Sequence, residues 1–212
     1  MKPNTQGGIH ILRTFFLYQE SGTLEPIEEL MDEHRVIERV LGIIEIAADL
    51  LDDDETVDPE LFVDIVDFLS TFADKCHHSK EEKHLFAKMQ ECGASGEVGP
   101  IAVMLREHQD GRAHVRKMAE LSQKKMTKAN KAAMAKASRA YVELLSQHIR
   151  KEDNVLYPMA KQILSGEDMK DLEKSFSEVE EKIMGPGVHE KFHRKIEEWD
   201  KKYGRPDGPG TT

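Results

Sequence analysis

The sequence contains only two cysteines, Cys76 and Cys92, and they do not form a Cys-x-x-Cys pair. This scarcity excludes a disulfide framework and a thiolate metal site, and it predicts a reducing compartment, so we expect a cytoplasmic protein. Aromatic residues make up only 6% of the chain, whereas Glu, Lys, Ala, Leu and Met are abundant. This composition favours helices and disfavours β-sheets.

Long apolar runs are also missing. Nowhere does the chain contain the roughly 18 uninterrupted apolar residues that a membrane span requires. The apolar stretch from Ile9 to Tyr18 is interrupted by Arg13 and lacks a small-residue cleavage site, so it does not predict a signal peptide. The chain has a net charge of -10. The resulting field repels phosphate, which excludes broad binding to nucleic acids or anionic membranes.

Four long segments have the apolar periodicity of helices, with apolar residues three and four positions apart. They begin at Pro26, at Pro59, at Pro100 and after Thr127, where a proline or an N-cap residue marks a helix start. Because the connections between them are short, we predict an all-α fold, an up-down-up-down four-helix bundle over residues 26–165. A C-terminal helical extension follows the bundle.

The predicted organisation has four parts. They are an N-terminal segment over residues 1–25, the bundle over 26–165, the helical extension over 166–203 and a disordered tail over 204–212. Within the extension we expect one helix over about 167–182 and a short last helix that ends near Trp199 to Tyr203.

A His-x-x-x-Glu motif occurs twice, as His77 to Glu81 and as His148 to Glu152. Residues four apart stand above one another on one helix face, so the imidazole and the carboxylate can reach a single point. The second motif continues an apolar stripe, whose other members are Tyr141, Leu145, Val155 and Met159. A pair of metal ions could share each carboxylate.

The first motif has two possible registers, because His78 and Glu82 have the same spacing as His77 and Glu81. The positions four, eight and eleven before His77 are apolar, namely Ala73, Leu69 and Val66. The equivalent positions of the other register are polar, so we predict that His77 and Glu81 face the core. By the same criterion we predict that His78, like His114, is solvated.

Two lone histidines, His34 and His108, lie on the apolar stripes of the first and third helices. Each is about eight residues into its helix, and in an up-down bundle that level agrees with both paired motifs to within two turns. A lone buried histidine is more often a satisfied core residue than a ligand. The alignment in one layer favours a six-ligand site, formed by His34, His77, Glu81, His108, His148 and Glu152.

Four imidazoles and two carboxylates without sulfur suit iron, or alternatively manganese, and disfavour a structural zinc site. If both glutamates bridge, two ions bind, joined by the carboxylates and by an oxygen from solvent. Each ion is then five-coordinate. The open position predicts binding of O2, nitric oxide or peroxide.

The complete pattern resembles the hemerythrin-like (HHE cation-binding) family. It consists of a lone His, His-x-x-x-Glu, a second lone His and a second His-x-x-x-Glu, with Leu-Phe or Leu-Tyr-Pro after the paired motifs. The resemblance covers about residues 26–165 and implies a four-helix bundle with a non-haem di-iron site. The position four after His108 is Arg112, and the last ligand is Glu152. These features resemble the four-His, two-Glu subset that includes iron-sulfur cluster repair proteins.

Three further residues are candidates for contacts around the site. Arg112 lies on the stripe below His108, Cys76 precedes His77, and His84 is three residues after Glu81. Each also has a simpler interpretation: Arg112 could extend to solvent, Cys76 could fill the core and His84 could lie at the surface. The spacing of His189 and His193 would suit a metal, but no carboxylate or apolar stripe supports it, and His10 has no visible partner.

The functional prediction is a non-haem di-iron protein that binds or reacts with O2, nitric oxide or peroxide, in sensing, storage or stress protection. One alternative is an enzyme that reduces peroxide or nitric oxide, or that donates iron in iron-sulfur cluster repair. Another is a metal-free helical interaction module. Whether the protein is an enzyme, and its oligomeric state, are left open.

Overall fold

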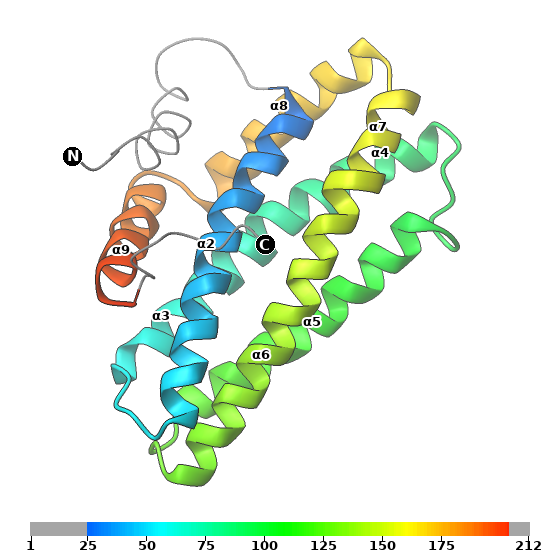
Figure 1. Ribbon diagram of the computed structural model, residues 1–212. Helices are drawn as coiled ribbons and strands as arrows, with labels where there is room; N and C mark the ends of the chain where they lie inside the picture. Colours follow the sequence, from blue (N-terminus) through cyan, green and yellow to red (C-terminus); the bar gives the residue numbers. More distant parts are fainter. Residues whose placement is uncertain (1–24, 204–212) are drawn as a thin grey trace, which may run out of the picture.

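The computed structural model describes residues 25–203, and within this range it contains helices and no strands (Figure 1). The predicted all-α fold is therefore confirmed. Residues 1–24 of the predicted N-terminal segment, with His10, lie outside the described residues, as does the predicted disordered tail over 204–212.

Four rods form the bundle, and successive rods run in opposite directions in Figure 1. Rod one is α2 (Pro26–Asp52), and rod three is α5 (Pro100–Ser122). Rod two consists of α3 (Pro59–Phe68), the π-helical segments η1 (Leu69–His78) and η2 (Glu81–Leu85), and α4 (Phe86–Glu91). Rod four consists of α6 (Lys128–Lys151), the π-helical segment η3 (Glu152–Leu156) and α7 (Tyr157–Ile163).

The rods begin where the sequence signals predicted. Pro26, Pro59 and Pro100 each occupy the first turn of a helix, where the missing N–H removes no hydrogen bond. The Asp58 side chain accepts a hydrogen bond from the backbone N–H of Glu60 at 3.1 Å. The Thr127 side chain caps α6 in the same way. These caps satisfy donors that a helix start leaves unpaired.

A π-helical segment begins at the glutamate of each His-x-x-x-Glu motif. Its i→i+5 pattern adds a residue to the turn and rotates the residues that follow out of α-helical register. In rod four this rotation buries Leu156 and Tyr157, each 1% exposed, and leaves Val155 52% exposed. The prediction that Val155 belongs to the core stripe was therefore wrong, because it assumed an uninterrupted α-helix.

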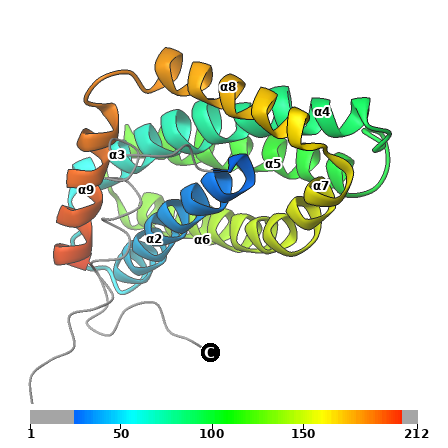
Figure 2. The same ribbon diagram turned by 90° about the horizontal axis from the view of Figure 1, so that it is seen from above.

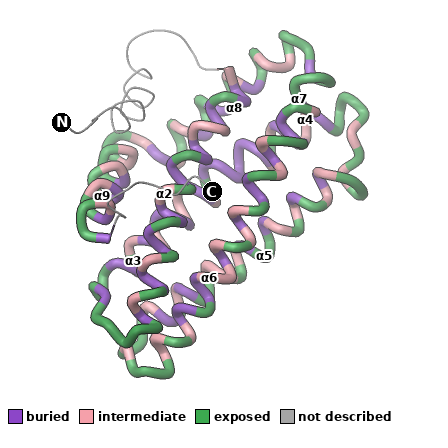
Figure 3. Tube along the Cα trace, viewed as in Figure 1, coloured by how far each residue is buried: buried purple, intermediate pink, exposed green. Residues whose placement is uncertain are grey.

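Two further helices, α8 (Gly166–Ile183) and α9 (Val188–Tyr203), form the C-terminal extension and lie against the bundle in Figure 2. Leu172 and Phe176 of α8 share a core cluster with the starts of rods one and three and the ends of rods two and four. Those of α9 join a second cluster, including Phe192 and Trp199. Figure 3 shows buried positions along the inner faces of all these helices.

Among residues 25–203, no helix combines the length and apolarity that a membrane span requires.

Candidate metal centre

The six predicted ligands all come from the inner faces of the four rods. Each is at most 1% exposed: His34 in α2, His77 in η1, Glu81 in η2, His108 in α5, His148 in α6 and Glu152 in η3. Since the rods alternate in direction, residues far apart in the sequence reach the same level of the core. The structure therefore brings all six together.

The donor atoms form two groups in which every atom lies within 4.8 Å of the others. The first group is His34, His77, Glu81 and Glu152. The second is His78, Glu81, His108 and His148. Because Glu81 belongs to both groups, the arrangement offers two neighbouring positions for a cation.

Glu152 also connects the two groups. Its Oε2 lies 3.2 Å from His34 Nε2 in the first group and 3.1 Å from His148 Nε2 in the second. Its Oε1 lies 3.8 Å from His108 Nε2. The two glutamates thus lie between the two pairs of imidazoles, as carboxylates that bridge two ions must.

Three carboxylate oxygens at this centre are buried and have no hydrogen-bond partner in the structure: Oε2 of Glu81 and both oxygens of Glu152. The other oxygen of Glu81 accepts a hydrogen bond from the Tyr157 hydroxyl at 2.8 Å. Burying a carboxylate oxygen without a partner carries a large free-energy cost, so such groups are normally paired or bind a metal. The unpaired oxygens fit a cation site.

Four carboxylates outside the donor groups orient the four imidazoles of the predicted set. The Nδ1-to-oxygen contacts are His34 to Asp153 at 2.7 Å, His77 to Glu33 at 2.7 Å, His108 to Glu82 at 2.7 Å and His148 to Glu107 at 3.0 Å. An ionised carboxylate only accepts hydrogen bonds, so each Nδ1 carries the proton. Each Nε2 is then left to donate its lone pair towards the centre, an arrangement that recurs around protein-bound metals.

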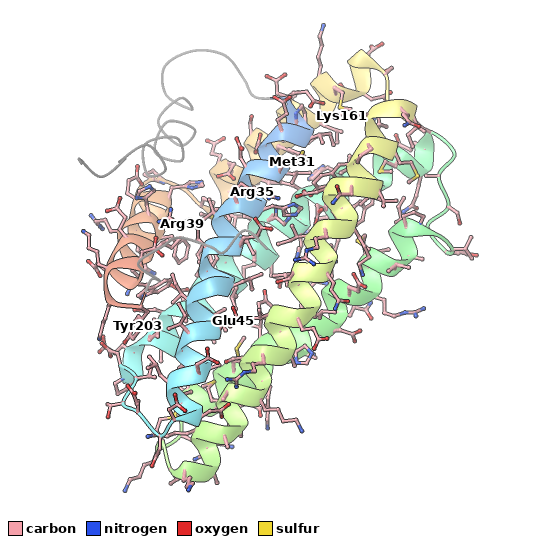
Figure 4. All side chains as sticks on the ribbon, viewed as in Figure 1. Met31, Arg35, Arg39, Glu45, Lys161 and Tyr203 are labelled. Carbon is pink, nitrogen blue, oxygen red and sulfur yellow. The ribbon has the colours of Figure 1, made fainter. Side chains whose placement is uncertain are left out.

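Each of these carboxylates is held in turn by a cationic side chain. The pairs are Asp153 with Arg35, Glu33 with Lys80, Glu82 with Arg112 and Glu107 with Lys151. Arg35 is labelled on α2 in Figure 4. Sequence reasoning identified none of the four acids, although a signal existed: each is the immediate neighbour of a predicted ligand.

The buried Lys80 connects α8 to the centre. Its side chain is fully buried, and its Nζ lies 2.6 Å from Glu29, 2.5 Å from Glu33 and 2.5 Å from Glu180. Burial alone would lower the pKa of Lys80, but the three carboxylates raise it well above its usual value. Since Glu180 belongs to α8 and Glu33 contacts His77, the extension reaches a predicted ligand through this lysine.

Cys76 also lies in this cluster, with its Sγ 3.0 Å from Glu180. Burial and the neighbouring carboxylate of Glu33 raise the pKa of the Cys76 thiol. A thiol that keeps its proton is a poor nucleophile and a poor metal ligand. These properties agree with the simpler prediction, that Cys76 fills the core beside the site.

The prediction that His78 is solvated was wrong. Its side chain is 6% exposed, and its ring stacks on that of His108, with centroids 3.9 Å apart and an angle of 19° between the planes. In the wider turn of η1, adjacent residues differ less in direction than in an α-helix, so both His77 and His78 turn inward. Burial and the nearby imidazole of His108 hold the pKa of His78 well below its usual value.

The remaining candidates lie outside the two donor groups. Arg112 donates from Nε to Asp74 at 2.7 Å and from Nη2 to Glu82 at 2.9 Å, so it supports the partner of His108. The ring of His84 lies 6.5 Å from that of Phe176 in α8. His114 is only partly buried.

The histidines of the extension have their own carboxylate contacts. His189 Nε2 lies 2.6 Å from Glu180, and His193 Nδ1 lies 3.4 Å from Glu197. Neither histidine belongs to a donor group among the described residues.

The charged groups of the metal-free centre stabilise one another. Although burial lowers it, the pKa of His34 is raised to about 9, mainly by the adjacent carboxylates of Asp153 and Glu152. Against the same effect of burial, Glu152 and Glu107 raise the pKa of His148 to about 10. Burial alone would raise the pKa of Glu152, but the imidazoles of His148 and His34 hold it well below its usual value. A cation would replace the protons on both Nε2 atoms.

Comparisons with known proteins agree with this geometry. Residues 25–160 match the model of the hemerythrin HHE cation binding domain. Uncharacterized proteins of Mycobacterium bovis (Mb2018) and Mycobacterium tuberculosis (Rv1995) are each 22% identical to the chain over 179 residues, which cover 84% of this chain and 69% of each relative. The family match spans well over half of the chain and includes all six predicted ligands, and the chain therefore belongs to the hemerythrin HHE cation-binding family.

Proposed function

We propose that this protein is a non-haem di-iron protein that binds or reacts with O2, nitric oxide or peroxide, in sensing, storage or stress protection in the cytoplasm. The observation that carries the proposal has two parts. Three buried carboxylate oxygens of Glu81 and Glu152 have no hydrogen-bond partner, and the Nε2 atoms of all four imidazoles lie within 3.7 Å of these two carboxylates. A cation pair would satisfy both sets of atoms at once.

In the proposed assignment, His34 and His77 hold one ion and His108 and His148 hold the other. Glu81 and Glu152 bridge them. A donor set of imidazoles and carboxylates without sulfur suits iron, and manganese is the alternative. The carboxylates that hold each Nδ1 fix the tautomer and the ring orientation before any ion binds, so the site is preorganised.

A redox-active ion pair bound here would supply affinity for small oxygen and nitrogen ligands. The chain's own contribution is to exclude water and to place the donors. The ligands are almost fully buried, and the Tyr157 hydroxyl holds one oxygen of Glu81. Burial and the adjacent Glu81 raise the pKa of Tyr157 well above its usual value, so this hydroxyl keeps its proton and remains a donor.

Metal analysis of the protein tests the proposal. The wild type, purified without added metal, should contain two irons per chain. His148→Ala removes one imidazole, together with its contacts to Glu152 and Glu107, so at least one iron should be lost. His114→Ala, a partly buried histidine of α5 outside the donor groups, is the matched control and should retain both ions.

Two results would contradict the proposal. Retention of two irons by the His148→Ala variant would remove this residue from the ligand set. Wild-type protein that contains no metal, and that takes up none on anaerobic addition of ferrous iron, would favour the metal-free interaction module instead.

A further inference from the structure

A cavity of about 130 Å³ lies beside the second donor group, between rods two, three and four. It has room for about four water molecules at roughly 30 Å³ each. Its wall includes His78, Asp74 and Arg112, together with Glu107 and Tyr141. Glu107 is the partner of His148, so the cavity borders the half of the centre formed by His108 and His148.

His78 lies between this cavity and the centre. It lines the cavity, and one of its ring nitrogens lies within 4.8 Å of the donor atoms of Glu81, His108 and His148. A small molecule that moved from the cavity to an ion held by His108 and His148 would therefore pass or contact the His78 ring.

The stacking of His78 on His108 argues against both rings binding one ion in this arrangement. A metal lies near the plane of each imidazole that binds it. The rings of His78 and His108 are nearly parallel, with 19° between their planes and 3.9 Å between their centroids. No single point therefore lies in both ring planes and close to a nitrogen of each ring. His78 is thus positioned beside the ion site, with a nitrogen available for a hydrogen bond.

The surroundings of His78 indicate which kind of hydrogen bond it can make. Its Nδ1 faces Asp74 Oδ1 at 3.4 Å, a long contact in which the carboxylate can only accept. The proton is then on Nδ1, and Nε2 is an acceptor. The wall carries two more acceptors, the carboxylates of Asp74 and Glu107. It also carries two guanidinium groups, that of Arg116 and that of Arg112, which donates to Asp74 and Glu82.

We propose that this cavity is the ligand chamber of the centre and that His78 accepts a hydrogen bond there from a small, neutral, protic molecule, of which hydrogen peroxide is the best match. This inference rests on the proposed function, because it places the ligand at the proposed ion pair. Hydrogen peroxide carries two O–H donors, which match the His78 nitrogen and the carboxylates of the wall. Nitric oxide, O2 and the azide ion carry none.

The test compares His78→Leu and His78→Gln with the wild type and with His84→Leu, a control histidine of the same rod that does not line the cavity. Three quantities are measured on iron-loaded protein: iron per chain, the affinity for azide, and the second-order rate constant for the reaction with hydrogen peroxide. His78→Leu should retain two irons and change azide affinity by less than about twofold. Its rate constant with peroxide should fall about tenfold, the effect of one lost hydrogen bond.

His78→Gln keeps a side-chain acceptor and should recover part of the rate, and His84→Leu should match the wild type. Loss of iron in His78→Leu would overturn the proposal by making His78 a ligand. An unchanged rate with peroxide, or an equal change for peroxide and azide, would also overturn it. Wild-type protein without iron would overturn the proposed function itself, and metal analysis before any ligand is added distinguishes that failure.

Discussion

The two halves of the metal centre have equivalent ligands in different surroundings. Each half has two imidazoles, and each imidazole is held by a carboxylate that a cationic side chain anchors. On the His77 side the anchor is Lys80, with an exposed fraction of 0%, whereas on the His148 side it is Lys151, at 39%. The other two anchors, Arg35 and Arg112, are 45% and 29% exposed. We call the first half, which alone contains a buried anchor, the closed half, and the second, which borders the cavity, the open half.

Part of this difference comes from outside the part of the chain that matches the family. The matched region ends at residue 160, whereas Glu180, which binds Lys80, belongs to α8. The proposed ligands come from the bundle that matches the family, but part of the support of His77 comes from the extension. Chains that share the ligand motif can thus differ in how firmly each half of the centre is held.

The largest expected effect is that of Lys80→Met. The substitution keeps the volume approximately but leaves Glu29, Glu33 and Glu180 facing one another without their cation. Removing one partner of a buried ionic cluster typically costs about 3–5 kcal/mol, so we expect a loss of that size in the free energy of unfolding, measured in urea.

Lys151→Met is the matched control for this comparison. It removes the same charge from the other half, but Lys151 is 39% exposed, and exposed ion pairs contribute about 0–1 kcal/mol. Equal losses in the two variants would break the distinction between a closed half and an open half.

The next largest expected effect is a loss of stability of the metal-free protein as pH rises, and it involves one histidine of each half. In the metal-free protein burial lowers the pKa of both histidines, but the adjacent carboxylates raise that of His34 to about 9 and that of His148 to about 10. The unfolded value is about 6.5. A raised pKa contributes stability that is complete below the unfolded value and is lost as pH rises through the folded value.

We therefore expect the unfolding free energy of the metal-free protein to fall by about 2–3 kcal/mol between pH 6.5 and pH 9.5. One pKa unit corresponds to about 1.4 kcal/mol. The two shifts do not add, because both imidazoles share the carboxylate of Glu152. Iron-loaded protein should lose less, because the ions replace these protons. Urea unfolding with and without iron at three pH values measures the difference. A parallel decline in both forms would argue against ions at these imidazoles.

The sequence allowed the rods, their starts and the six proposed ligands to be predicted, because each depends on spacing along one helix. What it could not provide depends on contacts between helices or on departures from α-helical register. Glu180 and Lys80 are 100 positions apart, and no periodicity connects them. The orientations of His78 and Val155 follow from π-helical turns, which a 3.6-residue pattern does not describe.

The smallest expected effect compares two equivalent carboxylates, through Glu33→Gln and Glu107→Gln. Each variant replaces the acceptor for a ligand's Nδ1 by an amide, Glu33 for His77 and Glu107 for His148. Loss of such a partner typically weakens metal binding about 10- to 100-fold, and we expect a decrease in this range for both variants in chelator competition.

Only Glu33→Gln should also lower the stability of the metal-free protein, because Glu33 neutralises the buried Lys80. Similar metal affinity of the two variants is the expected result, because the two carboxylates hold their imidazoles in the same way. Equal stability of the two metal-free variants would contradict the prediction, because it would show that the closed half does not depend on the contact between Glu33 and Lys80.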